Sequence, residues 1–573
     1  MQDKVVKKEI RFSWHIPKTD GGREDYHYVR EDVTYESGKI EPKTYLVANF
    51  KRPIFVTTPT YRNHKEKKEF EHKERLTMQM TTQSDLNMTT ARLLGQPHLA
   101  RQIDEVKSSP YVYGYDVTST SLIKYTSLKK NDFVQSLYTV AAFDIETNPN
   151  TDEILMASIV MGKKAYVSLL RKFVKYIPDT QRRVKEMSDK LLVNHKDLEI
   201  TVALHDNEVD MLKDVFRVAN EWQPVFLAIW NMDFDVTKIL NCLKKYNINP
   251  IDVFCDQKIP RYTRVCRYKR GQSKKVTQSG AVKPINPSLQ WHTLICTSPF
   301  YVIDAMCTYR QLRMAKQEEP SYSLDSILQK ELGTRKLRFE QAEEYSGVKW
   351  HLFMQEQYPI EYIVYNIYDC LGILELEEKN KDMSSVLPAF AGITDFQKFN
   401  SQIKKITDAL FLFGLEKDMI TGTVGSIPKE MEDVVDGVDA EEDDDSEEEE
   451  FNEDDPNNYK TLGLKGWIQL LPQNLLVQDG LRCLEEYPDV VTNLRGLTSD
   501  LDSISSYPSC LQAGNVSKAT CVNEIIDIKG VSEEDFREQN LVLCLGATNM
   551  LDYFHVMFDM PSIDMIDEAL DNL

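Results

Sequence analysis

An acidic tract limits how this chain of 573 residues can fold, because it separates the sequence into independent parts. Between Glu432 and Asp455 there are sixteen acidic residues and no basic one. Like charges at this density repel one another, and too few apolar side chains remain for a core, so we expect a disordered loop at 430–457. The favoured interpretation is a spacer or solubility element, and the alternative is a DNA-mimicking or partner-binding segment.

The same tract accounts for most of the net charge of the chain. The formal net charge is −21, and without these sixteen acids it is −5. No apolar run approaches the length of a membrane span, and the first residues lack the apolar segment of a secretion signal. Ten scattered cysteines without a CxxC pair indicate neither a zinc ribbon nor a disulfide framework. We therefore expect a reduced, cytosolic protein that is not secreted and has no membrane partner.

The length of the chain predicts several domains. Alternating apolar segments predict a mixed N-terminal domain at 1–130. At 131–385, successive strand candidates followed by helix, strand and helix predict a mixed sheet covered by helices. We expect 386–495 to return to the N-terminal domain or to form a linker with the acidic loop, and 496–573 to form a partial domain. The expected fold class is α/β, in a mixed α+β multidomain chain.

A pair of carboxylates in the strand segment FDIE is the first candidate for a metal site. Asp144 and Glu146 are two residues apart, so both side chains leave the same face of the sheet. Two adjacent carboxylates repel each other unless a cation neutralises them, and hard oxygen ligands suit magnesium or manganese. By itself a D-x-E pair is more often a surface pair than a metal site.

Two later segments add further candidates. In WNMDFD, Asp235 opens a helix directly after a buried strand, where helix capping is the simpler interpretation. In YNIYD, Tyr365 and Asp369 are four residues apart on a helix, so the phenol and the carboxylate stand one turn apart and can hold one water molecule. The alternative for this second segment is an ordinary Tyr–Asp surface pair.

The order of these segments along the chain carries a resemblance to a known family. D-x-E on a strand, N-x-x-F-D at a strand-to-helix junction and Y-x-x-x-D on a later helix resemble the three motifs of the 3′–5′ proofreading exonuclease domain of family B DNA polymerases. PSYSLDSI at 320–327, YNIYD at 365–369 and DSISSYPSCLQAGNVSKAT at 502–520 are similar to the polymerases of T-even bacteriophages. The resemblance covers roughly residues 110 to 520 with interruptions, and the first hundred residues are only compatible with it.

The resemblance implies a ribonuclease-H-like exonuclease domain that binds two divalent ions, Mg²⁺ or Mn²⁺. Hydrolysis of a phosphodiester needs an activated water and neutralised charge on the attacking and leaving oxygens, which two ions about 3.5–4 Å apart provide. Tyr365 would orient the attacking water, and Asn231 and Phe234 would contact DNA. All of these residues are present, so we expect an active nuclease. The metal ligands that the resemblance implies are Asp144, Glu146, Asp235 and Asp369.

A basic segment lies between the second and third motifs. Residues 258–275, KIPRYTRVCRYKRGQSKK, contain eight Lys or Arg and two Tyr. In the family a β-hairpin occupies this interval and helps to hold the frayed primer strand apart from the template. Basic side chains would meet phosphates and aromatic rings would stack on unpaired bases. A solvated basic loop is the alternative. The expected DNA contacts are Arg261, Arg264, Arg267, Lys269 and Arg270.

The segment DSISSYPS resembles motif A of the polymerase site, D-x-x-S-L-Y-P-S. The spacing to Tyr507 selects Asp502 as the ligand of both catalytic ions in a completed polymerase site. Backbone amides near Ser505 and Ser506 would contact the triphosphate of a dNTP, and Tyr507 would pack under the sugar and exclude a 2′-hydroxyl. Ser506 replaces the leucine of the family pattern, which puts the packing behind the nucleotide in doubt.

The remaining parts of a polymerase site do not follow this segment. After residue 509 there is neither a fingers helix, K-x-x-x-N-S-x-Y-G, nor a D-T-D turn, and YGYDVTS at 113–119 lacks the second acid. The resemblance therefore implies the N-terminal portion of a replicative DNA-directed DNA polymerase, split or partial, with a 3′–5′ exonuclease and the first part of the palm. DNA synthesis would need a second polypeptide with fingers, the rest of the palm and thumb. A truncated piece of a single long chain is the alternative.

Two other classes of function remain open. One is a free-standing 3′–5′ DNA exonuclease with a non-catalytic palm remnant, and the other is a non-enzymatic replication scaffold. For the polymerase the expected partners are primer–template DNA and single-stranded DNA, and the resemblance also allows a sliding clamp. The expected location is the cytoplasm of an infected bacterial host or a viral replication compartment.

Overall fold

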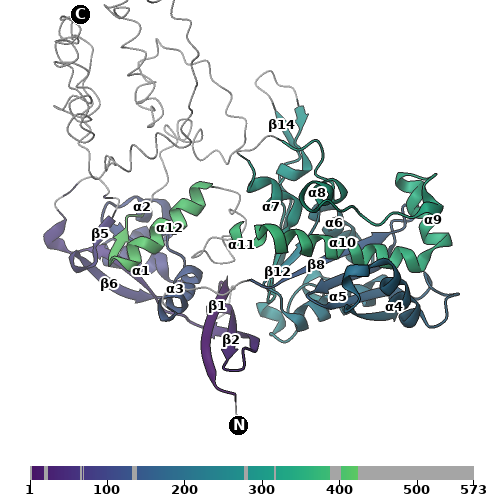
Figure 1. The fold of residues 1–573 in the computed structure, drawn as a ribbon. Coiled ribbons are helices and arrows are strands. Elements are labelled where there is room, and N and C mark those ends of the chain that lie inside the picture. The colour runs from purple at the N-terminus through teal and green to yellow at the C-terminus, as the bar shows by residue number, and fades with distance from the viewer. Residues whose placement is uncertain are drawn as a thin grey trace, which may run out of the picture. The chain divides into compact units, whose positions relative to one another are not determined.

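The computed structural model describes residues 3–18, 24–62, 64, 68, 70–131, 138–276, 282–314, 318–386 and 402–423 (Figure 1). The chain divides into two compact units, Met1–Glu447 and Glu448–Leu573, and all described residues belong to the first. The predicted acidic loop at 430–457 and the predicted palm segment at 496–573 lie outside the described residues. Among the residues that are described, no helix has the length and apolar character needed to cross a membrane.

The N-terminal part of the first unit is built from small sheets and short helices. One sheet has the order β1-β2-β3, a second has the order β6-β4-β7, and β5 pairs with β18 from the far end of the described chain. The strands are β1 (Val5–Ile16), β2 (Tyr26–Tyr35), β3 (Ile40–Ala48), β4 (Arg52–Thr57), β5 (Phe70–His72), β6 (Leu76–Thr81), β7 (Val112–Tyr113) and β18 (Met419–Thr421). The helices are α1 (Leu86–Leu93), α2 (Ile103–Ser108), α3 (Ser119–Lys130) and α12 (Gln402–Glu416).

An eight-stranded mixed sheet forms the centre of the following region, in the order β11-β10-β9-β8-β12-β17-β16-β13. Its middle strand, β8, is antiparallel to β9 and parallel to β12. The strands are β8 (Val140–Thr147), β9 (Ile154–Met161), β10 (Lys164–Leu170), β11 (Glu199–His205), β12 (Phe226–Ile229), β13 (Cys266–Lys269), β16 (Thr293–Cys296) and β17 (Tyr301–Asp304). A separate antiparallel pair is β14 (Lys274–Val276) and β15 (Val282–Pro284).

Helices cover both faces of this sheet (Figure 1). Alternation along β8 sends Phe143 into a core shared with α5 and α6, while its neighbour Ala142 packs in a second core with α4, α8 and α10. The predicted mixed α/β sheet covered by helices is therefore confirmed. The helices are α4 (Thr180–Leu191), α5 (Glu208–Trp222), α6 (Met232–Lys245), α7 (Ala305–Gln311), α8 (Leu324–Leu332), α9 (Gly347–Gln357), α10 (Pro359–Asn380) and α11 (Asp382–Val386).

A buried arginine ties the N-terminal sheet to the large one. Arg30 of β2 lies entirely inside the protein, where its guanidinium donates to Asp32 Oδ1 at 3.0 Å. The same group donates to the carbonyl of Pro299 at 2.7 Å and to the carbonyl of Pro224. These two carbonyls lie just before β17 and β12, so one cation fixes the points at which both strands begin. A buried charge is tolerated only with such a set of partners.

Candidate metal centre

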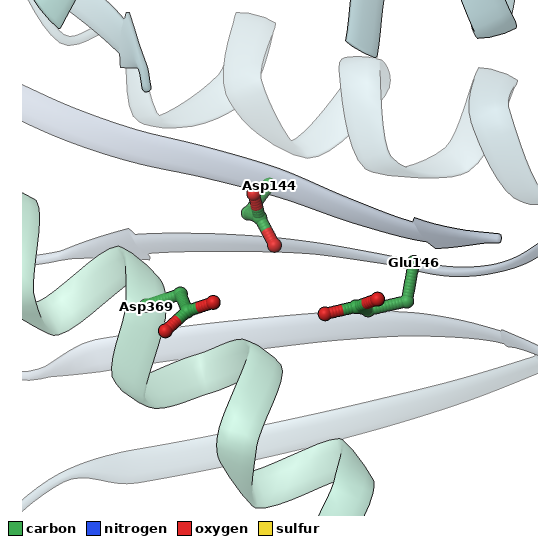
Figure 2. Close-up of side chains that lie close together, drawn as sticks. All are labelled: Asp144, Glu146 and Asp369. Atoms are coloured by element: carbon green, nitrogen blue, oxygen red, sulfur yellow. The ribbon is translucent and has the colours of Figure 1, made fainter. Parts of the chain in front are cut away.

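Three carboxylates from β8 and α10 converge on one point (Figure 2). Asp144 and Glu146 project from the same face of β8, as their spacing predicts, and Asp369 approaches from the helix that covers this face. One carboxylate oxygen from each residue lies within 4.8 Å of the other two. Glu146 and Asp369 are buried and Asp144 is partly buried, so the cluster belongs to the interior and not to a solvated surface.

The cluster is electrostatically unfavourable when all its members are ionised. Burial raises the pKa of Asp144 well above its usual range, and the charges of Asp235, Asp369 and Glu146 raise it further. Burial also raises the pKa of Asp369, and it raises the pKa of Glu146 to about 7. Buried carboxylates with raised pKa values hold protons unless a cation replaces them. The donor set is oxygen only, which is the set that Mg²⁺ and Mn²⁺ prefer.

Each of the three carboxylates is held through one oxygen. Asn366 Nδ2 donates to Asp144 Oδ2 at 2.6 Å, and the Tyr362 hydroxyl donates to Glu146 Oε2 at 2.5 Å. Lys336 Nζ donates to Asp369 Oδ2 at 2.6 Å. The other oxygen of Asp369, Oδ1, is buried and has no hydrogen-bond partner within the described part of the chain. An unpaired buried carboxylate oxygen is costly, and a bound cation would satisfy it.

The fourth predicted ligand, Asp235, lies beside this group and outside its tightest part. It is buried in the first turn of α6, and its Oδ1 accepts the backbone N–H of Ile145 at 3.2 Å. Ile145 stands between the two acids of β8, so this bond joins α6 to the strand that carries the site. Asp235 is not the N-cap of α6, because Asn231 holds that position and Asp304 accepts the N–H of Met232 at 2.9 Å. The simple capping interpretation of Asp235 is therefore wrong.

Tyr365 lies next to Asp369 and is paired with Lys336. Lys336 Nζ donates to the Tyr365 hydroxyl oxygen at 3.1 Å as well as to Asp369. Burial acts to lower the pKa of Lys336, but the charges of Asp369, Tyr365 and Asp144 raise it well above its usual range, so the ammonium group stays charged. The Tyr365 oxygen accepts from the lysine, and a hydrogen bond from the Tyr365 hydroxyl also acts to lower the pKa of Asp369.

Sequence reasoning missed several of these polar groups. Tyr362 and Asn366 share the face of α10 with Tyr365 and Asp369, and their spacing of i, i+3, i+4 and i+7 could have identified them. Lys336 has no such signal, because it lies in the loop after α8, 33 residues before Asp369 in the sequence. Only the fold brings this lysine to the site.

The predicted DNA contacts fall into two groups. Phe234 is 47% exposed on the first turn of α6, and Asn231 begins that helix in a left-handed conformation with φ of 59°. Both residues precede Asp235, Asn231 as the N-cap of α6 and Phe234 as its direct neighbour, so an amide and an exposed aromatic ring lie at the helix end that carries this carboxylate.

The predicted basic residues at 258–275 differ in their partners. Arg261 pairs with Asp252 at 2.8 Å, Arg264 donates to the carbonyl of Ile259 at 2.9 Å, and Arg270 pairs with Asp233 at 2.8 Å. Arg267 and Lys269 are exposed at alternate positions of the edge strand β13, and neither forms an ion pair within the described ranges. They lie on one face of this strand. The predicted nucleotide contacts Asp502, Ser505, Ser506 and Tyr507 lie outside the described residues.

Comparison with known protein families agrees with this geometry. Residues 98–327 match the exonuclease domain of DNA polymerase family B, a range that contains Asp144, Glu146 and Asp235. No curated protein matches the chain. The match supports a family B polymerase, and the mixed sheet with its helices fits the predicted ribonuclease-H-like fold. Exonuclease domains of this family act on DNA and use divalent metals, and the buried carboxylate cluster supplies suitable ligands.

Proposed function

We propose that this chain removes nucleotides from the 3′ end of single-stranded DNA, as the proofreading part of a replicative family B polymerase of the T-even bacteriophage type. The observation that carries the proposal is the convergence of Asp144, Glu146 and Asp369 within a chain whose residues 98–327 match the exonuclease domain. A buried all-oxygen cluster suits hydrolysis of a phosphodiester, because that reaction needs positive charge at both the attacking and the leaving oxygen.

The residues around the cluster have different roles in the proposed reaction. Asp144, Glu146 and Asp369 would hold two divalent ions, Mg²⁺ or Mn²⁺, with Asp235 as the fourth ligand. Bound ions lower the pKa of a water molecule and neutralise developing charge on the phosphate. Asn366 and Tyr362 fix the orientation of Asp144 and Glu146 through the hydrogen bonds that they donate.

Tyr365 and Lys336 have complementary roles. Lys336 donates to the Tyr365 hydroxyl oxygen, so the O–H of this tyrosine can donate a hydrogen bond that orients the attacking water or a phosphate oxygen. The same ammonium group acts to lower the pKa of Asp369, which burial raises. Lys336 therefore fixes the orientation of both Tyr365 and Asp369 before DNA binds. An active site needs such preorganised polar groups.

Metal dependence tests this proposal. We expect the full chain to shorten a 5′-labelled single-stranded oligonucleotide in Mg²⁺ or Mn²⁺, because its buried carboxylates need cations to remain ionised together. Excess EDTA should stop the reaction, and added Mg²⁺ should restore it. A denaturing gel that resolves single-nucleotide steps from the 3′ end is the measurement. Equal hydrolysis with EDTA, or products that shorten only from the 5′ end, would contradict the proposal.

DNA binding should depend on the unpaired cations of β13 and not on all the basic residues of the segment. Replacing Arg267 and Lys269 with Gln should make the negative slope of log K against log salt shallower by about 1.4, since each phosphate contact on single-stranded DNA contributes about 0.7 to its magnitude. The matched control replaces Arg261 and Arg264, which are held by Asp252 and by the Ile259 carbonyl. A binding titration at several salt concentrations should show a smaller change in this control. A slope equal to that of the wild-type chain in both variants would return the segment to the interpretation as a solvated loop.

We further propose that DNA synthesis needs parts beyond those in this sequence. Asp502 and Tyr507 would contribute motif A, with Ser505 and Ser506 at the triphosphate. Fingers, the remaining palm with its two ions, and thumb would come from a second polypeptide, and a sliding clamp is a further partner of such an assembly. The setting is the cytoplasm of an infected bacterium. The second candidate, a free-standing exonuclease, is favoured if no such partner exists.

A further inference from the structure

Helix α9 lies beside the carboxylate cluster and has no role in the chemistry proposed above. It follows the residues that match the exonuclease family, 98–327. His351 and Gln355 are four residues apart, so they lie on one face of this helix. Both contact the hydroxyl of Tyr362, the group that donates to Glu146 Oε2 at 2.5 Å. This face of α9 therefore reaches the candidate metal site through one tyrosine.

Gln355 connects α9 to the strand that carries the site. Its Nε2 donates to the carbonyl oxygen of Thr147 at 2.9 Å and to the Tyr362 hydroxyl oxygen at 3.2 Å. A carbonyl oxygen can only accept, so the atom of Gln355 that faces Thr147 is the amide nitrogen. Thr147 directly follows Glu146 and ends β8. The buried Gln355 side chain thus holds the strand next to a metal ligand and donates to Tyr362 at the same time.

The three partners of the Tyr362 hydroxyl decide the direction of its bond to Glu146. A phenol hydroxyl has one proton to donate and two lone pairs that accept. An ionised Glu146 can only accept, so it takes the proton, while Gln355 fills one lone pair. His351 Nδ1 lies 2.7 Å from the same oxygen and fills the second lone pair as a donor. With both lone pairs filled, the Tyr362 hydroxyl can bind Glu146 only as a donor.

Aromatic packing holds these groups in the same arrangement. The His351 ring meets the Tyr362 ring edge-on, with ring centroids 5.9 Å apart. The neighbouring Trp350 packs on Tyr365 with ring centroids 5.1 Å apart, so α9 contacts both tyrosines of the site. The His351 side chain is nevertheless 35% exposed. Its replacement therefore removes a hydrogen bond without opening a large cavity in the core.

We propose that His351 and Gln355 are positioning residues, which lock the Tyr362 hydroxyl as a donor and so hold Glu146 in its metal-binding orientation. This inference rests on the proposed function. Hydrogen-bond partners of a ligating carboxylate fix its orientation, and their loss typically costs about 10–100-fold in metal affinity or activity. Without donors on its acceptor side, the Tyr362 hydroxyl can rotate its proton away from Glu146. If α9 only packed against the core, loss of the His351 donor would leave the metal affinity unchanged.

The Mn²⁺ affinity of the full chain without DNA tests this role. His351→Phe keeps an aromatic ring and loses the donor, so the Mn²⁺ concentration for half-saturation should rise by about tenfold. His351→Asn places an amide N–H near the position of Nδ1 and should bring the affinity back to within about twofold of wild type. Tyr362→Phe removes the hydroxyl itself and should weaken binding at least as much as His351→Phe. Electron paramagnetic resonance of free Mn²⁺ measures each titration, and the Asp144→Ala, Glu146→Ala variant gives the background from acids elsewhere in the chain.

Hydrolysis of single-stranded DNA gives a second readout. At limiting Mg²⁺, His351→Phe should shorten a 5′-labelled strand about tenfold more slowly than wild type, and a high Mg²⁺ concentration should restore most of the rate. KM for the DNA should not change, because α9 acts on a metal ligand. His195→Phe is the matched control, since His195 is also half-buried and pairs with a glutamate, Glu375, at 2.8 Å. This control should change neither the metal affinity nor the rate.

Wild-type Mn²⁺ affinity in folded His351→Phe and Tyr362→Phe variants would overturn the inference, even if the wild-type chain hydrolyses DNA. An equal loss of affinity in His351→Asn and His351→Phe would overturn it as well, because the donor would then not be the cause. Absence of hydrolysis by a wild-type chain that binds Mn²⁺ would instead contradict the proposed function, and the affinities of the variants would still decide the positioning role.

Discussion

Replacing Asp144 and Glu146 together with alanine should lower 3′–5′ hydrolysis of single-stranded DNA by at least about a thousandfold, because neutralisation of the attacking and leaving oxygens depends on cations held there. Asp144 and Glu146 are the two members of the carboxylate cluster on β8. The double variant therefore leaves Asp369 of α10 as the one remaining member of that cluster of three. The measurement is the initial rate of shortening of a 5′-labelled oligonucleotide in saturating Mg²⁺.

The folded state should survive this change. Burial raises the pKa of both Asp144 and Glu146, so both carboxyl groups oppose folding when they are ionised without a cation. Their removal should therefore leave the thermal midpoint in EDTA equal to that of wild type or higher, as is common when active-site strain is relieved. Asp206→Ala with Glu221→Ala, two exposed acids in surface ion pairs, is the matched control and should keep full activity. Undiminished degradation by a folded Asp144→Ala, Glu146→Ala variant would place the nuclease elsewhere.

Primer extension should require more than this chain. The chain alone should not extend a primer with dNTPs, because phosphoryl transfer to a 3′-hydroxyl needs two ions held by carboxylates from two separated segments. Asp502 can supply one of these segments, and no D-T-D turn or fingers lysine motif follows it in the sequence. Extension should appear when a polypeptide with these elements is added, and co-purification of the native protein is the way to find it.

A substitution in motif A distinguishes the two activities. Asp502→Ala in the reconstituted pair should abolish extension and leave exonuclease activity within about twofold of wild type, since the exonuclease ligands lie more than a hundred residues earlier in the chain. Ser503→Ala, the adjacent position, is the matched control and should retain both activities. Robust extension by the purified chain alone would end the proposal of a divided polymerase, and so would synthesis by the Asp502→Ala pair.

Much of the fold and half of the candidate site could be predicted from sequence periodicity. A strand period of two placed Asp144 and Glu146 on one face, and a helical period placed Tyr365 four residues from Asp369 on another element. These relations are local, so the sequence contains them directly. The mixed sheet with helices on both faces followed from the order of the elements for the same reason.

The remaining parts of the site depend on contacts between distant segments. Lys336 comes from a loop, and no periodic pattern indicates that its ammonium group will lie 2.6 Å from Asp369. The sequence of Asp235 is compatible with a helix cap because this residue stands near the start of a helix after a buried strand, and only the fold shows its bond to Ile145. The composition of the basic segment predicts DNA contacts, but it does not reveal that Arg270 is already paired with Asp233.

The buried position of Arg30 has a consequence for the order in which this protein can fold as it is synthesised. The two proline carbonyls that accept from its guanidinium lie 194 and 269 residues later in the chain. A cation cannot leave water without its partners, so Arg30 stays hydrated until the ribosome has released the chain through Pro299. The first sheet that is synthesised is therefore completed late, only after β12 and β17, which follow β8 in the order of strands in the large sheet, have begun to emerge.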